Sequence, residues 1–143
     1  MHPSLPFEDI VTEEALATWA ARFSSRLQPG DVVCLYGDLG AGKTSYVRAC
    51  LTAMIGHPID VPSPTFTLCQ IYDTPQGEVH HYDLYRIKSV EEIIELGLRE
   101  HMSSVITFIE WPQLIEASFP APTYGVTLKH HTPLMRLLSI QGK

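Results

Sequence analysis

The sequence predicts a three-layer α/β domain, in which a mixed β-sheet lies between helices on both of its faces. Two short apolar runs, residues 32–36 and 105–109, have the length and character of buried strands. Other segments repeat apolar residues at the spacing of one helix face. The length of 143 residues suits a single domain, 1–143, and an apolar content of 45% with 18% charged residues is typical of globular proteins.

The first predicted helix begins after Thr12, which is a good N-cap residue. Glu13 and Glu14 follow in the first turn, where the helix dipole favours carboxylates. We expect this helix to end at Pro29-Gly30. Its apolar stripe consists of Leu16, Trp19, Ala20, Phe23 and Leu27.

A glycine-rich loop follows the strand predicted at residues 32–36. Its pattern, Gly37-x-x-x-x-Gly42-Lys43-Thr44, fits the P-loop at every defined position, so the domain is predicted to be P-loop NTPase-like. Glycines allow positive φ, and the backbone N–H groups can then wrap a phosphate at a helix N-terminus. Lys43 would reach the β- and γ-phosphates, and the Thr44 hydroxyl would ligate Mg²⁺. The loop residues predicted to bind nucleotide are Asp38, Leu39, Gly40, Ala41, Gly42, Lys43, Thr44 and Ser45.

The second predicted helix follows the loop directly and stops at Gly56. Three prolines in residues 57–65 exclude a helix or a central strand, so an ordered loop is expected there. Strands at 66–72 and 78–84 should form a hairpin around residues 73–77. The apolar positions of the second helix are Val47, Cys50, Leu51, Met54 and Ile55.

The rest of the chain is predicted to hold one short helix and a closing strand pair. Ser89-x-x-Glu92 is a capping box that opens the helix. The strands are expected at 124–129 and 134–140, with "HHTP" between them.

Three further residues are candidates for nucleotide chemistry. Glu110 follows the strand predicted at 105–109, at the carboxyl end where α/β sheets bind ligands, and could hold the Mg²⁺ shell. Asp83, in "HHYDLYR", is a second carboxylate, or else a surface residue or a partner for Arg86. Thr65 could offer its hydroxyl to a γ-phosphate as part of a switch, but the proline-braced loop could equally be a rigid connector.

The neighbouring histidines His80 and His81 invite a metal interpretation. Successive strand residues point to opposite faces, so the two cannot readily chelate one ion. We therefore expect ordinary, half-exposed histidines. Trp111, directly after Glu110, could pack over the site or seal the core.

Composition limits the partners and the compartment. The net charge of −6, without a basic run, predicts a poor direct grip on nucleic acid, so an RNA connection would run through a partner protein. The odd number of cysteines (Cys34, Cys50 and Cys69) predicts buried reduced thiols. The sequence shows neither a signal peptide nor a run of about 20 apolar residues, so a cytoplasmic location is expected.

Five motifs occur in a set order: "YGDLGAGKT", "SPTFTL", "HYDLYR", "IIELGL" and "IEWP". Together they resemble the bacterial TsaE (YjeE) family, the P-loop ATPase of tRNA threonylcarbamoyladenosine biosynthesis. The resemblance implies a slow, Mg²⁺-dependent ATPase that docks on the TsaB–TsaD pair. That pair attaches the threonylcarbamoyl group to adenosine 37 of tRNAs that read codons beginning with A, and the ATPase would touch tRNA only indirectly.

The resemblance also implies roles for individual residues. Thr44 and Glu110 would ligate the metal, and Asp83 would ligate it or orient water. Nucleotide would also contact Thr12 or Glu13 and, near the C-terminus, Arg136. The residues implied in catalysis are Lys43, Thr65, Asp83 and Glu110.

Two other functions stay open on the sequence. A small-molecule kinase usually needs an arginine-bearing lid, and no cluster of arginines follows the second helix. A nucleotide-binding adaptor without meaningful hydrolysis would show the same motifs. The chain contains no Asn-Lys-x-Asp sequence, so nothing argues for guanine.

Overall fold

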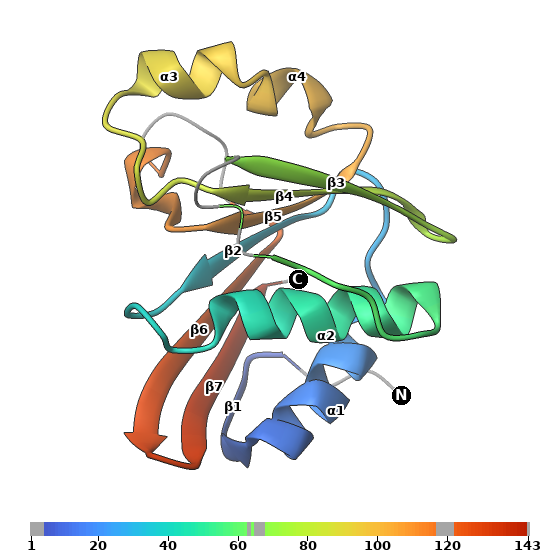
Figure 1. The fold of residues 1–143 in the computed structure, drawn as a ribbon, viewed down its shortest axis with the longest axis vertical. Coiled ribbons are helices and arrows are strands. Elements are labelled where there is room, and N and C mark those ends of the chain that lie inside the picture. Colours follow the sequence, from blue (N-terminus) through green and yellow to red (C-terminus); the bar gives the residue numbers. More distant parts are fainter. Residues whose placement is uncertain (1–4, 63, 65–67, 117–121, 143) are drawn as a thin grey trace.

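The computed structural model describes residues 5–62, 64, 68–116 and 122–142. Its middle layer is a seven-stranded mixed sheet of order β1-β7-β6-β2-β5-β4-β3. Figure 1 shows how the strands and helices are arranged. The strands are β1 (Phe7–Thr12), β2 (Val32–Tyr36), β3 (Cys69–Thr74), β4 (Gly77–Asp83), β5 (Ile106–Glu110), β6 (Tyr124–Thr132) and β7 (Met135–Gly142). The helices are α1 (Glu13–Ser24), α2 (Lys43–Ile55), α3 (Val90–Glu95) and α4 (Leu98–His101), with a 3₁₀ turn η1 (Pro112–Leu114).

The centre of the sheet is parallel and its two sides are antiparallel. Strand β2 is parallel to both of its neighbours, β5 and β6, and β4 is parallel to β5. The pairs β3/β4, β6/β7 and β1/β7 are antiparallel. The carboxyl ends of β2, β4 and β5 therefore meet at one edge of the sheet, next to the start of α2.

Helices cover both faces of the sheet, which confirms the predicted layers (Figure 1). Helices α1 and α2 pack on one face in a core that includes Val33 and Leu35 of β2. On the other face Cys34 joins a second core with Ile93 of α3 and Leu98 of α4. This alternation along β2 follows from the two-residue period of a strand.

The predicted elements around the glycine-rich loop are confirmed. Strand β2 has the predicted bounds, and α2 ends at Gly56, whose left-handed φ of 96° terminates it. The side chain of Thr12 caps α1, and the capping box of Ser89 and Glu92 opens α3. The first helix is shorter than predicted, since it ends at Ser24, although Leu27 is still buried in the same core.

The antiparallel side of the sheet differs most from the prediction. Strand β1 was not predicted, because only its pairing with β7 defines this edge strand. The last hairpin is longer than predicted: residues 130–132 belong to β6, and the turn lies at Pro133-Leu134. Strand β3 begins at Cys69; residues 65–67 lie outside the described part of the chain.

The three cysteines are free; Cys34 and Cys50 are buried, as predicted, but Cys69 is only half-buried. Among the described residues, no helix is both long and apolar enough to cross a membrane.

Candidate functional site

The glycine-rich loop connects β2 to α2 through three glycines with positive φ, Gly37, Gly40 and Gly42. Gly42 takes the N-cap position of α2 with a φ of 107°, and Gly37 has a φ of 150°. A Cβ on Gly37 would collide with the backbone oxygen of Leu128 in β6. Glycine is therefore required where the loop leaves the strand.

Lys43 is nearly buried within the loop, with 5% of its surface exposed. Its Nζ donates to the carbonyl oxygens of Gly37 and Asp38, the latter at 3.1 Å, and lies 3.9 Å from the ring centroid of Trp111. Burial lowers the pKa of Lys43, and the nearby carboxylates of Glu110, Asp83 and Asp38 oppose that shift. Additional negative charge next to Lys43 would therefore stabilise its protonated form.

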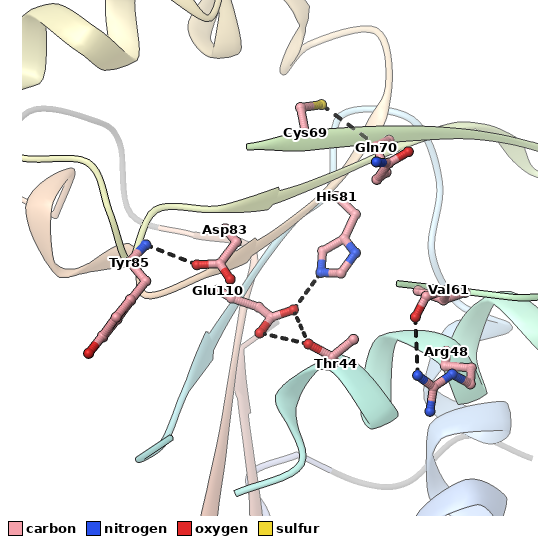
Figure 2. A network of polar contacts seen from close by, with 9 residues as sticks. All are labelled: Thr44, Arg48, Val61, Cys69, Gln70, His81, Asp83, Tyr85 and Glu110. Carbon is pink, nitrogen blue, oxygen red and sulfur yellow. Dashed lines mark hydrogen bonds and ion pairs between the residues drawn. The ribbon is translucent and has the colours of Figure 1, made fainter. Parts of the chain in front are cut away.

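Thr44 and Glu110 come together across the sheet edge. Glu110 ends β5, the parallel neighbour of β2, and is 3% exposed. The Thr44 hydroxyl donates toward its carboxylate, 2.8 Å from Oε2 and 3.1 Å from Oε1 (Figure 2). P-loop proteins hold Mg²⁺ with groups of these two kinds, a hydroxyl at the start of the helix and a carboxylate at the end of a strand.

Asp83 lies directly beside Glu110, because these two residues are paired in the register of β4 and β5. Its side chain is 3% exposed, so the surface alternative is wrong. Its Oδ1 accepts a hydrogen bond of 2.9 Å from the backbone N–H of Tyr85 (Figure 2). The Tyr85 ring in turn packs on Trp111, with 4.8 Å between the ring centroids.

The histidines correct the prediction. Both are buried rather than half-exposed: His80 is 4% exposed and His81 is not exposed at all. They do take opposite faces, as strand geometry requires. His80 contacts Glu78 on the α4 side, at 2.6 Å, whereas the Nε2 of His81 lies 2.6 Å from Oε2 of Glu110. His81 is thus a site residue that the sequence analysis missed, although its i, i+2 spacing from Asp83 places it on the same face.

Lys43, Thr44, Asp83 and Glu110 line a cleft of about 320 Å³, which we call the strand-end cleft. In the described part of the chain, no three His, Cys, Asp or Glu residues form a metal cluster. Mg²⁺ does not require one, since it usually takes one or two carboxylates together with substrate phosphates and waters. The residues present therefore fit that ion. The lining residues are Leu39, Gly40, Ala41, Gly42, Lys43, Thr44, Ser45, Asp83, Tyr85, Glu110 and Trp111.

A second cleft, of about 470 Å³, lies on the other side of the loop and is called the hairpin cleft. Arg136 of β7 reaches it and donates from Nε to the carbonyl oxygen of Ala41, at 3.3 Å. Pairing of β1 with β7 sets Val11 opposite Arg136 and so brings the start of α1 to the same place. The lining residues are Thr12, Glu13, Glu14, Leu16, Ala41, Gly42, Ser45, Pro133, Leu134 and Arg136.

The structure thus gathers the predicted residues on both sides of one loop. Lys43, Thr44, Asp83 and Glu110 meet in the strand-end cleft, and Thr12, Glu13 and Arg136 meet in the hairpin cleft. Thr65 lies outside the described residues.

Comparisons with known proteins identify relatives of this chain. The family model "Threonylcarbamoyl adenosine biosynthesis protein TsaE" matches residues 10–137. A tRNA threonylcarbamoyladenosine biosynthesis protein TsaE from Rickettsia bellii is 44% identical over 132 residues, which are 92% of each chain. A protein of the same name from Bacillus subtilis is 35% identical over 117 residues, 81% of this chain and 70% of the relative. The crystal structure of Bacillus subtilis YdiB superposes with a TM-score of 0.75 and 26% identity, over 98% of this chain and 87% of that one. The chain belongs to the TsaE family of threonylcarbamoyl adenosine biosynthesis proteins.

Proposed function

We propose that this protein is a slow, Mg²⁺-dependent P-loop ATPase of tRNA threonylcarbamoyladenosine biosynthesis. The observation that carries the proposal is the Thr44 hydroxyl 2.8 Å from the Glu110 carboxylate, beside the buried ammonium of Lys43. This combination provides a cation for phosphate oxygens and a hydroxyl–carboxylate pair for a metal, at the N-terminus of α2.

Each side chain has a distinct part in the proposed reaction. The backbone amides of the loop and the Lys43 ammonium bind and orient the phosphates, while Thr44 and Glu110 would hold Mg²⁺. When bound, the metal neutralises charge that develops on the phosphoryl oxygens. Asp83, level with Glu110 on the neighbouring strand, would complete the metal shell or orient the attacking water. Trp111 and Tyr85 pack on each other and line the same cleft.

The hairpin cleft would hold the nucleoside end of ATP. Thr12 and Glu13 supply polar groups there, and Arg136, which cannot lose its charge at working pH, supplies a fixed cation. We expect Arg136→Ala to weaken ATP binding about tenfold, because a charge-assisted hydrogen bond contributes roughly 1.5 kcal/mol.

The proposed partner is the TsaB–TsaD pair, in the cytoplasm, with tRNA touched only through that complex. A net charge of −6 supports contact with proteins rather than with the phosphate backbone of RNA. A pull-down with TsaB and TsaD in ATP and in ADP tests this docking. We expect retention to depend on which nucleotide is present, and equal failure to bind in both would overturn it.

Turnover of ATP by the purified chain tests the activity. We expect slow hydrolysis that requires Mg²⁺, is abolished by Lys43→Ala and is strongly reduced by Glu110→Ala. Lys88→Ala removes an exposed lysine and serves as the matched control. Wild-type turnover in the Lys43→Ala variant would exclude this site. Full pathway activity in a variant that binds but does not hydrolyse ATP would instead identify a nucleotide-binding adaptor, and phosphate transfer to a metabolite would identify a kinase.

A further inference from the structure

His81 is a fully buried side chain that the proposed reaction does not yet use. Its Nε2 lies 2.6 Å from Oε2 of Glu110 (Figure 2). Its other ring nitrogen, Nδ1, has no hydrogen-bond partner among the described residues. Buried polar atoms are nearly always paired, so a histidine that served only the core would be expected to use both nitrogens. Within the described part of the chain, its one hydrogen bond is with the candidate metal ligand.

The chemistry of His81 and Glu110 indicates which group donates the hydrogen bond and which accepts it. An ionised carboxylate only accepts hydrogen bonds, so in the arrangement proposed here the Nε2–H of His81 would be the donor and Glu110 the acceptor. Strand geometry supports this approach: His81 and Asp83 lie on one face of β4, and the register sets Asp83 opposite Glu110. The imidazole thus reaches the carboxylate from the sheet side, opposite the helix that carries Thr44.

Two donors therefore converge on one carboxylate oxygen. The Thr44 hydroxyl is 2.8 Å and the His81 nitrogen 2.6 Å from Oε2, while Oε1 has the longer contact of 3.1 Å with Thr44. A carboxylate held from both sides has one orientation, whereas a glutamate held only by a rotatable hydroxyl can turn about its terminal bond.

We propose that His81 is a positioning residue for magnesium: its Nε2–H fixes the Glu110 carboxylate so that Glu110 and Thr44 present a single metal-binding geometry. This inference rests on the proposed function and deepens it. Groups that orient a metal ligand typically change metal affinity or activity about 10- to 100-fold when they are removed.

The test uses three variants and a readout other than turnover. Calorimetry of ADP binding at increasing Mg²⁺ gives the Mg²⁺ concentration for half-maximal binding. We expect His81→Leu to raise that concentration about tenfold or more, while ADP binding in EDTA stays within about twofold. His81→Gln keeps an amide donor at similar reach and should stay within about threefold of wild type. His80→Leu removes the neighbouring buried histidine on the opposite face and should leave the Mg²⁺ requirement unchanged.

The outcomes separate this inference from a structural role and from the proposed function. It is overturned if His81→Leu keeps the wild-type Mg²⁺ requirement, if His81→Gln is as impaired as His81→Leu, or if His80→Leu is equally impaired. If wild-type protein binds nucleotide with no dependence on Mg²⁺, the proposed function itself fails and takes this inference with it.

A measurement on the wild-type protein keeps the inference testable even if the variants do not fold. Long-range ¹H–¹⁵N correlation spectra of histidine rings report which nitrogen carries a proton. We expect a proton on Nε2 of His81. A neutral ring protonated only at Nδ1 could not donate to Glu110 and would overturn the inference.

Discussion

The strand-end cleft and the hairpin cleft lie on either side of the same loop, yet they hold their polar side chains differently. In the strand-end cleft Lys43, Asp83 and Glu110 are each at most 5% exposed. In the hairpin cleft Thr12 and Glu13 are exposed and Arg136 is half-buried. One cleft is built on the ends of parallel strands, and the other on a helix start and a strand hairpin.

The difference in burial has a chemical consequence. Charges fixed in a dry site act strongly and need no reorganisation when charge develops during a reaction. Exposed groups are screened by water and contribute mainly to binding. The comparison therefore supports the proposal that phosphate and metal would bind in the strand-end cleft and that the hairpin cleft would hold the rest of the nucleotide.

The substitution Glu110→Gln tests most directly whether the buried carboxylate of the strand-end cleft takes part in the chemistry. Glutamine keeps the size and can accept from Thr44, but it removes the charge that would hold the metal. We expect ATP turnover to fall about 1,000-fold, or about 4 kcal/mol of transition-state stabilisation, because metal-assisted charge neutralisation is worth several kcal/mol. Glu95→Gln, at an exposed position on α3, is the control. A loss of less than fivefold at Glu110 would show that the buried carboxylate has no part in the chemistry.

The two clefts also differ in how far they follow from local sequence. The P-loop, the strand before it and the carboxylate at the end of the strand at 106–110 are each contained in a few consecutive residues. Parallel strands place their carboxyl ends together, so the proximity of Thr44 and Glu110 could be anticipated. His81 was missed because burial of a histidine depends on which strand pairs beside it, and the sequence does not reveal strand order.

The hairpin cleft depends on contacts between distant parts of the chain. Strand β1 is an edge strand that exists only through its pairing with β7, and this pairing brings Thr12 near Arg136. The turn at Pro133-Leu134 was misplaced because residues 130–132 are polar and exposed but continue β6 in its ladder with β7. Only the resemblance to a family placed Thr12, Glu13 and Arg136 together beforehand.

The second test concerns the backbone that supports the strand-end cleft. In Gly37→Ala the new Cβ meets the backbone oxygen of Leu128, and φ is 150°. We expect a loss of about 3 kcal/mol in the free energy of unfolding, measured by urea denaturation, because neither backbone can yield easily. Gly40→Ala also has a positive φ but meets no atom within 4 Å, so its loss should be only about 1–2 kcal/mol. Equal losses would mean that contact with β6 does not shape the loop.

A third test asks whether Thr12 contributes to nucleotide binding. It compares the loss of the α1 cap, which lies in the hairpin cleft, with the loss of the α3 cap. Thr12→Ala removes the cap of α1, whose side chain accepts from the Ala15 N–H at 3.2 Å, and should cost about 1 kcal/mol. Ser89→Ala removes the cap of α3, which lies in neither cleft, and should cost a similar amount. Only Thr12→Ala should also weaken ATP binding, about threefold, as expected for one lost hydrogen bond. Equal ATP affinities in the two variants would remove Thr12 from the nucleotide site.

The smallest expected effect distinguishes the cations of the two clefts by their response to pH. Burial lowers the pKa of Lys43 in the folded protein below its ordinary value of 10.5. At pH values between the lowered pKa of the folded protein and the ordinary pKa of the unfolded chain, the unfolded chain binds more protons than the folded one. Stability relative to Lys43→Met should therefore rise with pH across that interval, with a slope below the one-proton limit of about 1.4 kcal/mol per pH unit. Nucleotide affinity should fall over the same interval, because a neutral amine no longer attracts phosphate.

The control is Arg136→Gln. Arginine side chains stay charged over this range, so the stability of Arg136→Gln should change with pH in parallel with that of wild type. A wild-type curve parallel to that of Lys43→Met would show that the buried ammonium keeps an ordinary affinity for its proton, and the contrast in burial would then carry no electrostatic weight.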